Sequence, residues 1–142
     1  MFDITKKSVL ETAEVELLNG DDSPLCDDEG KRLSVTVCGP GSKVWQQADA
    51  ERRRKATARV EKNKGKLTAA LDASGDDETE FLLAITVSFN GWEYPNPDGK
   101  KWVSQRDMFR AAYEDHTIGF IRKQVADASG DWSAFTKGSQ RT

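Results

Sequence analysis

A strict alternation of apolar and polar residues at 33–37, followed at once by a Gly-Pro-Gly step, constrains this sequence most. The alternation predicts a β-strand with three apolar side chains on one face: Leu33, Val35 and Val37. Residues 13–18 alternate in the same way, and the Asn-, Asp- and Gly-rich stretch between the two segments favours turns. We therefore predict a small antiparallel meander over about 12–38, with 24–26 pairing against the later strand. Its apolar face needs a cover, because a lone hairpin is marginal in water.

The Gly-Pro-Gly step stops the strand and leaves Ser42 placed to cap a helix. A long charged helix is predicted over 42–71, weakened at Gly65, with a break at 73–77 (Ala-Ser-Gly-Asp-Asp). Its narrow apolar stripe contains Trp45, Ala48, Ala56 and Val60, which Leu67 and Leu71 extend. A helix with so narrow an apolar stripe lies at the edge of a domain or packs against another subunit.

The part of the chain predicted to form a helical core is 77–135. Its most apolar run opens at Phe81, and a helix ending at Asn90-Gly91 would place one set of apolar side chains on a single face: Phe81, Leu82, Ile85, Phe89 and Trp92. The β-branched segment 85–87 keeps a strand open as the alternative.

Two further helices are predicted in this core, each with a hydroxyl side chain at its N-terminus. Ser104 caps the first, whose buried face is Met108, Phe109, Ala112 and Tyr113. Thr117 caps the second, whose apolar residues recur at helical spacing: Ile118, Ile121, Val125 and Ala128. Trp132 and Phe135 are predicted to form a terminal hydrophobic latch, and 137–142 a frayed tail. The whole chain, 1–142, is thus predicted to be one α+β domain, a small N-terminal antiparallel sheet followed by a helical C-terminal part.

Charge is distributed unevenly along the 142 residues, 37% of which are hydrophobic and 32% charged. Residues 1–42 hold four Lys/Arg and nine Asp/Glu, residues 43–66 hold nine and three, and residues 67–142 hold eight and twelve. A basic centre between acidic ends leaves self-association open, although these charges can equally be solvated.

Residues able to carry chemistry are sparse. The only histidine, His116, follows Glu114-Asp115 at a helix end, where neighbouring side chains do not face each other. Cys26 and Cys38 form no metal motif with it, and whether they pair stays open. The acidic residues at 21–29 do not have the spacing of a calcium loop. We predict no enzyme activity, no cofactor and no metal site.

No stretch of the sequence indicates a membrane. The N-terminus lacks the apolar region of a secretory signal, and the longest apolar run, 81–85, is too short to cross a bilayer. The prediction is a soluble, intracellular protein.

The basic segment 52–66 raises nucleic-acid binding as an alternative, with Trp45 as a stacking surface. Two observations weigh against it. The run 52–55 sweeps most of the helix circumference instead of one side, so its arginines are expected to face solvent. The chain as a whole also has a net charge of -3, which repels phosphate at long range.

The order of these signals, over about 12–135, resembles that of the tail assembly chaperones of long-tailed (siphovirus-type) bacteriophages. The likeness is carried by short motifs in sequence: Pro24-Leu25, Asp28-Glu29-Gly30-Lys31, Val35-Thr36-Val37, Gly39-Pro40-Gly41-Ser42, Asn90-Gly91-Trp92, Ser104-Gln105-Arg106-Asp107 and Ile121-Arg122-Lys123-Gln124-Val125. Met108 departs from the family pattern, in which Asn is expected.

The resemblance implies a protein that binds the tape measure protein and the tail tube protein in the host cell cytoplasm and is absent from the mature virion. Family members are often also made in a longer form by ribosomal frameshifting, and the family has no catalytic residues. The expected partner-binding residues lie on the charged helix: Trp45, Arg52, Arg53, Arg54, Lys55 and Arg59. Another small structural tail protein, of the completion or terminator type, is the alternative within phage tails.

Overall fold

The computed structural model describes residues 1–62 and 67–137 and shows a mixed α+β architecture, as the sequence predicted. A sheet of three antiparallel strands has the order β1 (Thr12–Glu16), β2 (Ser34–Cys38) and β3 (Thr86–Asn90). The register pairs Ala13 with Val37 and Val15 with Val35, so the alternating apolar residues of β1 and β2 share a face. The expected order of a sheet followed by helices holds only in part, because the third strand comes from the middle of the chain.

The segment 86–90, predicted to continue a helix through Phe89, is strand β3 instead. Helix α2 (Leu67–Ile85) ends one residue before it, and the Thr86 hydroxyl donates a 2.6 Å hydrogen bond to the carbonyl of Leu82. From there the chain pairs with the free edge of β2, Val35 opposite Phe89. The strand alternative, which the β-branched residues had kept open, is therefore correct at 86–90. Residues 81–85 are helical as predicted.

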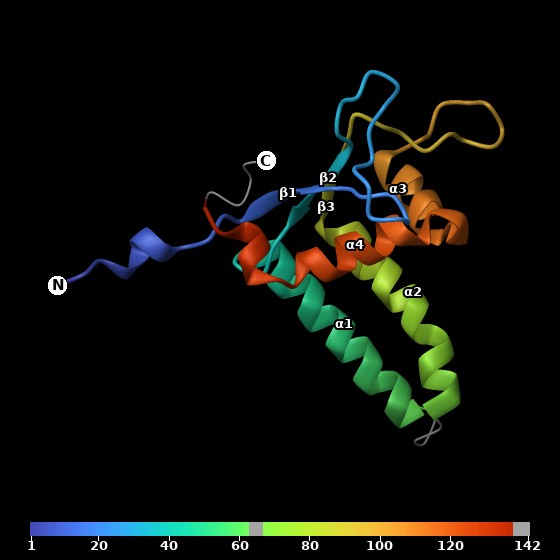
Figure 1. The fold of residues 1–142 in the computed structure, drawn as a ribbon. Helices are drawn as coiled ribbons and strands as arrows, with labels where there is room; N and C mark the ends of the chain where they lie inside the picture. The colour runs from blue at the N-terminus through green and yellow to red at the C-terminus, as the bar shows by residue number, and fades with distance from the viewer. Residues whose placement is uncertain (63–66, 138–142) are drawn as a thin grey trace.

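The charged helix also differs from its predicted extent. Helix α1 (Lys43–Lys62) begins after Ser42, whose hydroxyl accepts from the Trp45 amide as predicted. The chain then reverses, and α2 runs back beside α1 as an antiparallel helical hairpin (Figure 1). The prediction of one helix over 42–71 was thus wrong. The predicted break at 73–77 was also wrong, because these residues lie inside α2. Gly65 and residues 138–142 of the tail predicted at 137–142 lie outside the described residues.

Tertiary contacts keep α2 helical through its least favourable stretch. The Arg122 guanidinium donates to the carbonyl of Gly75 at 2.7 Å, and the Thr79 hydroxyl donates to the same oxygen at 3.0 Å. Arg59 of α1 forms an ion pair with Asp77. Arg122 and Arg59 lie far from these α2 residues in sequence, so local propensity alone could not indicate the two contacts.

Replacing Gly75 by Ala tests this continuous helix. A Cβ at Gly75 would meet nothing within 4 Å, and Ala restricts the unfolded chain more than Gly does. Gly75→Ala is expected to raise the free energy of unfolding by about 0.5–1 kcal/mol, measured by urea denaturation. A turn at 73–77, as the sequence indicated, would instead make the substitution neutral or destabilising.

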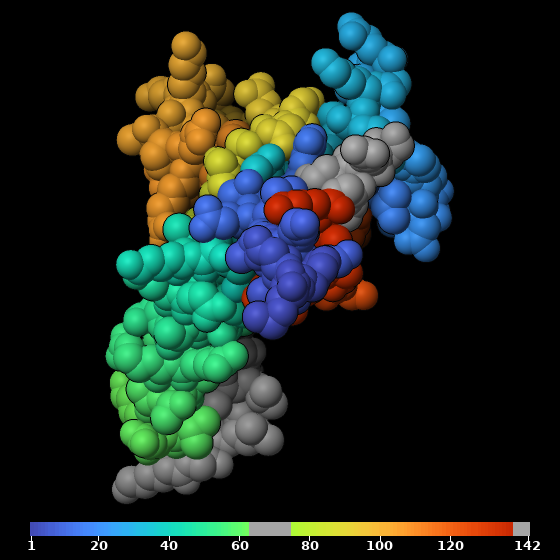
Figure 2. All heavy atoms as spheres, turned by 90° about the vertical axis from the view of Figure 1, so that its left-hand side faces the viewer, coloured from blue at the N-terminus to red at the C-terminus, as the bar shows by residue number. Residues whose placement is uncertain are grey.

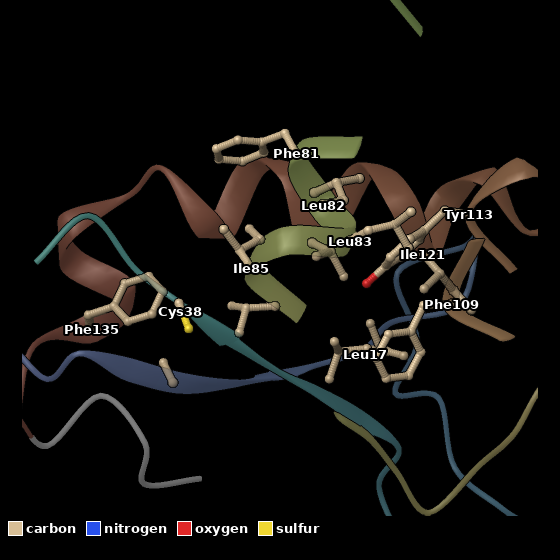
Figure 3. Packing of buried hydrophobic residues seen from close by; sticks show 14 residues of the cluster. Leu17, Cys38, Phe81, Leu82, Leu83, Ile85, Phe109, Tyr113, Ile121 and Phe135 are labelled. Atoms are coloured by element: carbon tan, nitrogen blue, oxygen red, sulfur yellow. The ribbon is translucent and has the colours of Figure 1, made fainter. Parts of the chain in front are cut away.

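The helices cover one face of the sheet. Helix α3 (Gln105–Glu114) packs against α2, and α4 (Gly119–Ser129) packs against β1 and β2. The largest fully buried apolar side chains come from four elements and the loop after β1 (Figure 3): Leu17, Val35, Val37, Leu82, Ile85, Val125 and Phe135. The side chain of Gln124 joins α4 to Leu18, just after β1. It accepts a hydrogen bond from the Leu18 amide at 2.8 Å and donates one to the Leu18 carbonyl at 2.9 Å.

The N-terminal caps of the helices in the C-terminal part of the chain were predicted with mixed success. Ser104 caps α3 through the Asp107 amide, and Phe109, Ala112 and Tyr113 are buried as expected. Thr117 does not cap α4; it lies within the short 3-10 helix His116–Ile118 and donates its own amide to Asp115. In the terminal 3-10 helix Trp132–Phe135, Phe135 is fully buried, whereas Trp132 is 55% exposed and is no part of a latch.

The segment between β1 and β2 forms a second, smaller hairpin. Isolated bridges join Leu18 to Pro24 and Cys26 to Arg32, so the predicted pairing of 24–26 with the later strand holds only in part, because Pro24 pairs with the earlier chain and Arg32 precedes β2. Its tip, Asp27–Gly30, closes through a hydrogen bond from the Gly30 amide to the Asp27 carbonyl. Cys26 and Cys38 are free thiols, which answers the open question of a disulfide.

Candidate partner-binding surface

Helix α1 has one buried residue along its whole length, and that residue is Asp49. The helix spans about 30 Å at 1.5 Å per residue, and with α2 it projects from the body of the molecule (Figures 1 and 2). The predicted stripe accounts for only part of its inner side: Trp45 and Ala48 are partly buried, but Ala56 and Val60 are exposed. The surface of α1 away from α2 is therefore open to other molecules.

Three of the predicted partner-binding residues instead hold the hairpin together. The Trp45 and Phe81 rings meet edge to face with centroids 5.9 Å apart. The Arg52 guanidinium lies 3.8 Å from the centre of the Phe81 ring, a cation–π contact. Arg59 pairs with the nearly buried Asp77 of α2. The expectation that Arg52 faces solvent was wrong, because Phe81 lies beside it on the neighbouring helix.

The buried carboxylate of Asp49 explains the conformation of two neighbouring arginines. Its Oδ1 accepts from Arg52 at 2.6 Å and its Oδ2 from Arg53 at 2.8 Å. A buried carboxylate without a cation would lower the stability of the fold, which favours the ion pair between Asp49 and Arg52. Two contacts therefore hold Arg52 in place, one with Asp49 and one with the Phe81 ring. Reversing the charge at Arg52 would therefore disturb the fold.

Arg53 and Arg54 are the predicted residues that do face solvent. Their side chains are 78% and 68% exposed. Arg54 donates to Glu51 at 2.5 Å, and this hydrogen bond lowers the pKa of the Glu51 carboxyl. Together with Ala50, Thr57, Ala58 and Glu61 they line a depression on the outer side of α1. This outer surface is where a partner can contact the hairpin without displacing contacts to α2.

Lys55 belongs neither with the inner arginines nor with the exposed pair Arg53 and Arg54. It lies at a cavity of about 180 Å³ where α1, α2 and α3 meet. Across it Glu80 accepts from Arg106 at 2.9 Å and from Arg110 at 2.6 Å. The hydrogen bond from Arg110 is the main cause that lowers the pKa of Glu80. Glu80 and Arg106 of this cavity thus already join α2 to α3.

A second surface, which the sequence interpretation missed, lies between the loop after β3 and the start of α3. Its cavity of about 620 Å³ is lined by aromatic, basic and apolar side chains, among them Tyr94, Lys100, Lys101, Trp102 and Met108. The loop is held in place, since Trp102 Nε1 donates to the Tyr94 carbonyl and the Tyr94 hydroxyl donates to Asp115, both at 2.6 Å. The alternation of aromatic and basic residues at 92–102 could have indicated this surface. The sequence interpretation instead relied on the turn-forming residues of the same stretch, which indicate only a loop.

The residues that could carry chemistry are engaged in structural contacts or exposed to solvent. The Asp115 carboxylate accepts from Thr117 and Tyr94, and these contacts lower its pKa. Burial raises the pKa of the Tyr113 phenol and of the Cys38 thiol. Within residues 1–62 and 67–137, no group of three or more His, Cys, Asp or Glu side chains is arranged to hold a metal ion.

Comparison with known proteins gives no assignment. No protein-family model, curated protein or solved structure matches this chain. In the described part of the chain, no helix combines the length and the apolar content needed to cross a membrane.

Proposed function

We propose that this protein is a tail assembly chaperone of a long-tailed bacteriophage, which acts by binding other proteins and not by catalysis. It binds the tape measure protein and the tail tube protein in the host cell cytoplasm and leaves before the virion is complete. The order of short motifs over about 12–135 supports the family. The observation that carries a binding role is helix α1, which packs by one narrow side and buries only Asp49.

The outer side of the helical hairpin is the proposed contact surface. Arg53 and Arg54 are exposed there beside Ala50 and Ala58, which is a mixture of charge and small apolar area that suits a reversible contact. Trp45, Arg52 and Arg59 support this surface from the inner side. Binding of nucleic acid finds less support, because Arg52, Arg53, Arg54 and Arg59 each form an ion pair with a carboxylate of the same chain.

Pull-down after co-expression tests the proposal. The tagged chain should retain the tape measure and tail tube proteins encoded near it in the same genome, and purified particles should lack it. Arg53→Ala/Arg54→Ala should weaken this binding about tenfold, a loss of about 1.4 kcal/mol, because both side chains are exposed. The free energy of unfolding of this variant should fall by only about 1 kcal/mol, because the buried Asp49 keeps Arg52 as its partner and the Arg54–Glu51 pair is exposed.

The matched control is Lys6→Ala/Lys7→Ala, which removes two exposed cations from the N-terminal 3-10 helix. This variant should bind like the parent chain. Failure to retain either partner would refute the chaperone role, and recovery of the chain in purified virions would indicate a structural tail component instead.

A further inference from the structure

The loop 92–103 carries two lysines that differ from the arginines of α1. Among the residues that the structure describes, no ion pair involves Lys100 or Lys101, and both are exposed. They follow Gly99, whose φ of +76° turns the chain, and they lie at the cavity with Tyr94 and Trp102. Two exposed cations outside these ion pairs, beside aromatic surface, suit a carboxylate-bearing segment.

The chain itself carries such a segment at the tip of its small hairpin. Asp28 and Glu29 are exposed there, and in the described ranges neither carboxylate has a hydrogen-bond or ion-pair partner. The tip is rigidly presented, because Asp27 Oδ1 accepts from the Glu29 amide at 2.8 Å and from the Lys31 amide at 2.9 Å. A segment that is already ordered loses little conformational entropy when it binds.

The charges on the two loops are complementary in kind. The tip carries three anions, Asp27, Asp28 and Glu29, followed by the cation Lys31, and the cavity has two cations together with the anion Glu93. Both loops lie at the same end of the molecule in Figure 1, yet in Figure 2 they stand on opposite sides of that end. One copy therefore does not bring its own tip to its own cavity, whereas a second copy placed face to face can do so.

We propose that two copies of this chain associate by reciprocal exchange, with the Asp27–Gly30 tip of each copy seated in the Tyr94–Trp102 cavity of the other. Such a contact obeys two-fold symmetry, because each copy contributes the same tip and the same cavity. Lys100 and Lys101 bind Asp28 and Glu29 of the opposite copy. The inference does not rest on the proposed function, since both surfaces belong to this chain.

Charge reversal tests the exchange. The parent chain is expected to dimerise with concentration in sedimentation velocity at low ionic strength, and to dissociate as salt is added. Lys100→Glu/Lys101→Glu and Asp28→Lys/Glu29→Lys should each weaken self-association at least about tenfold, because like charges then face each other. Both pairs are exposed, so circular dichroism should show the parent fold.

Mixing the two variants gives the decisive measurement. One variant then has an acidic cavity and tip and the other a basic cavity and tip, so both contacts of a mixed pair are attractive. Native mass spectrometry of the equimolar mixture should show the heterodimer in excess of either homodimer. Lys6→Glu/Lys7→Glu, which changes net charge as much as the cavity variant does, should dimerise like the parent.

Three results would each overturn the proposal. These are a parent chain that stays monomeric at low salt, reversal variants that dimerise as tightly as the parent, and a mixture in which no heterodimer forms. A monomeric parent whose cavity binds an acidic peptide of another protein would assign the cavity to that partner instead.

Discussion

Ile121→Asp is expected to abolish cooperative folding at 25 °C. Ile121 is 6% exposed on the side of α4 that enters the core, and the cluster around it consists of apolar side chains. A carboxylate there loses the burial of the isoleucine and has no cation to pair with. The two costs together amount to several kcal/mol, which is comparable with the total stability of about 5–15 kcal/mol of a domain.

The measurement is thermal and urea unfolding followed by circular dichroism. Lys123→Asp is the matched control, because Lys123 is exposed on the same helix and also becomes aspartate. It should change the free energy of unfolding by no more than about 0.5 kcal/mol. An Ile121→Asp protein that melts cooperatively near the parent temperature would show that α4 presents a different face to the sheet.

Phe135→Ala is expected to destabilise the domain by about 3–5 kcal/mol, the range for truncating a buried aromatic residue. Phe135 is fully buried (Figure 3), and its ring fills the space above Gly39, where any Cβ would overlap with it. Its carbonyl accepts from the Leu10 amide at 2.8 Å, so the last short helix also holds the segment that leads into β1. Loss of the ring leaves a cavity at this end of the sheet.

Trp132→Ala separates this site from the latch that the sequence predicted. Trp132 lies three residues away and is 55% exposed, so its loss should cost well under half of the Phe135→Ala effect when both are measured by urea denaturation. Equal losses would indicate that both rings pack into the core and would contradict the placement of Trp132.

The arginines of α1 show how far the candidate site could be predicted. The basic run identified a helix with an exposed side, the proposed partner surface, but not which side of the helix is free. Arg52 and Arg53 are adjacent in sequence, yet one stacks on Phe81 while the other faces solvent. That difference depends on where α2 lies. The lysines of the second surface were not singled out, because the ion pairs that a lysine forms depend on the folded structure and not on the sequence alone.

The sequence by itself determined the elements whose causes are local. Alternation gave β1 and β2, side-chain oxygens of Ser42 and Ser104 gave the starts of α1 and α3, and helical spacing gave Ile121 and Val125 among the buried residues of α4. Only the tertiary structure decided the elements whose causes are distant. The segment 86–90 became a strand because the edge of β2 offered hydrogen bonds, and α2 stayed helical through Gly75 because Arg122 reaches its carbonyl. Backbone hydrogen bonds and buried charges must be satisfied wherever partners exist, and those partners are fixed by packing and not by neighbours along the chain.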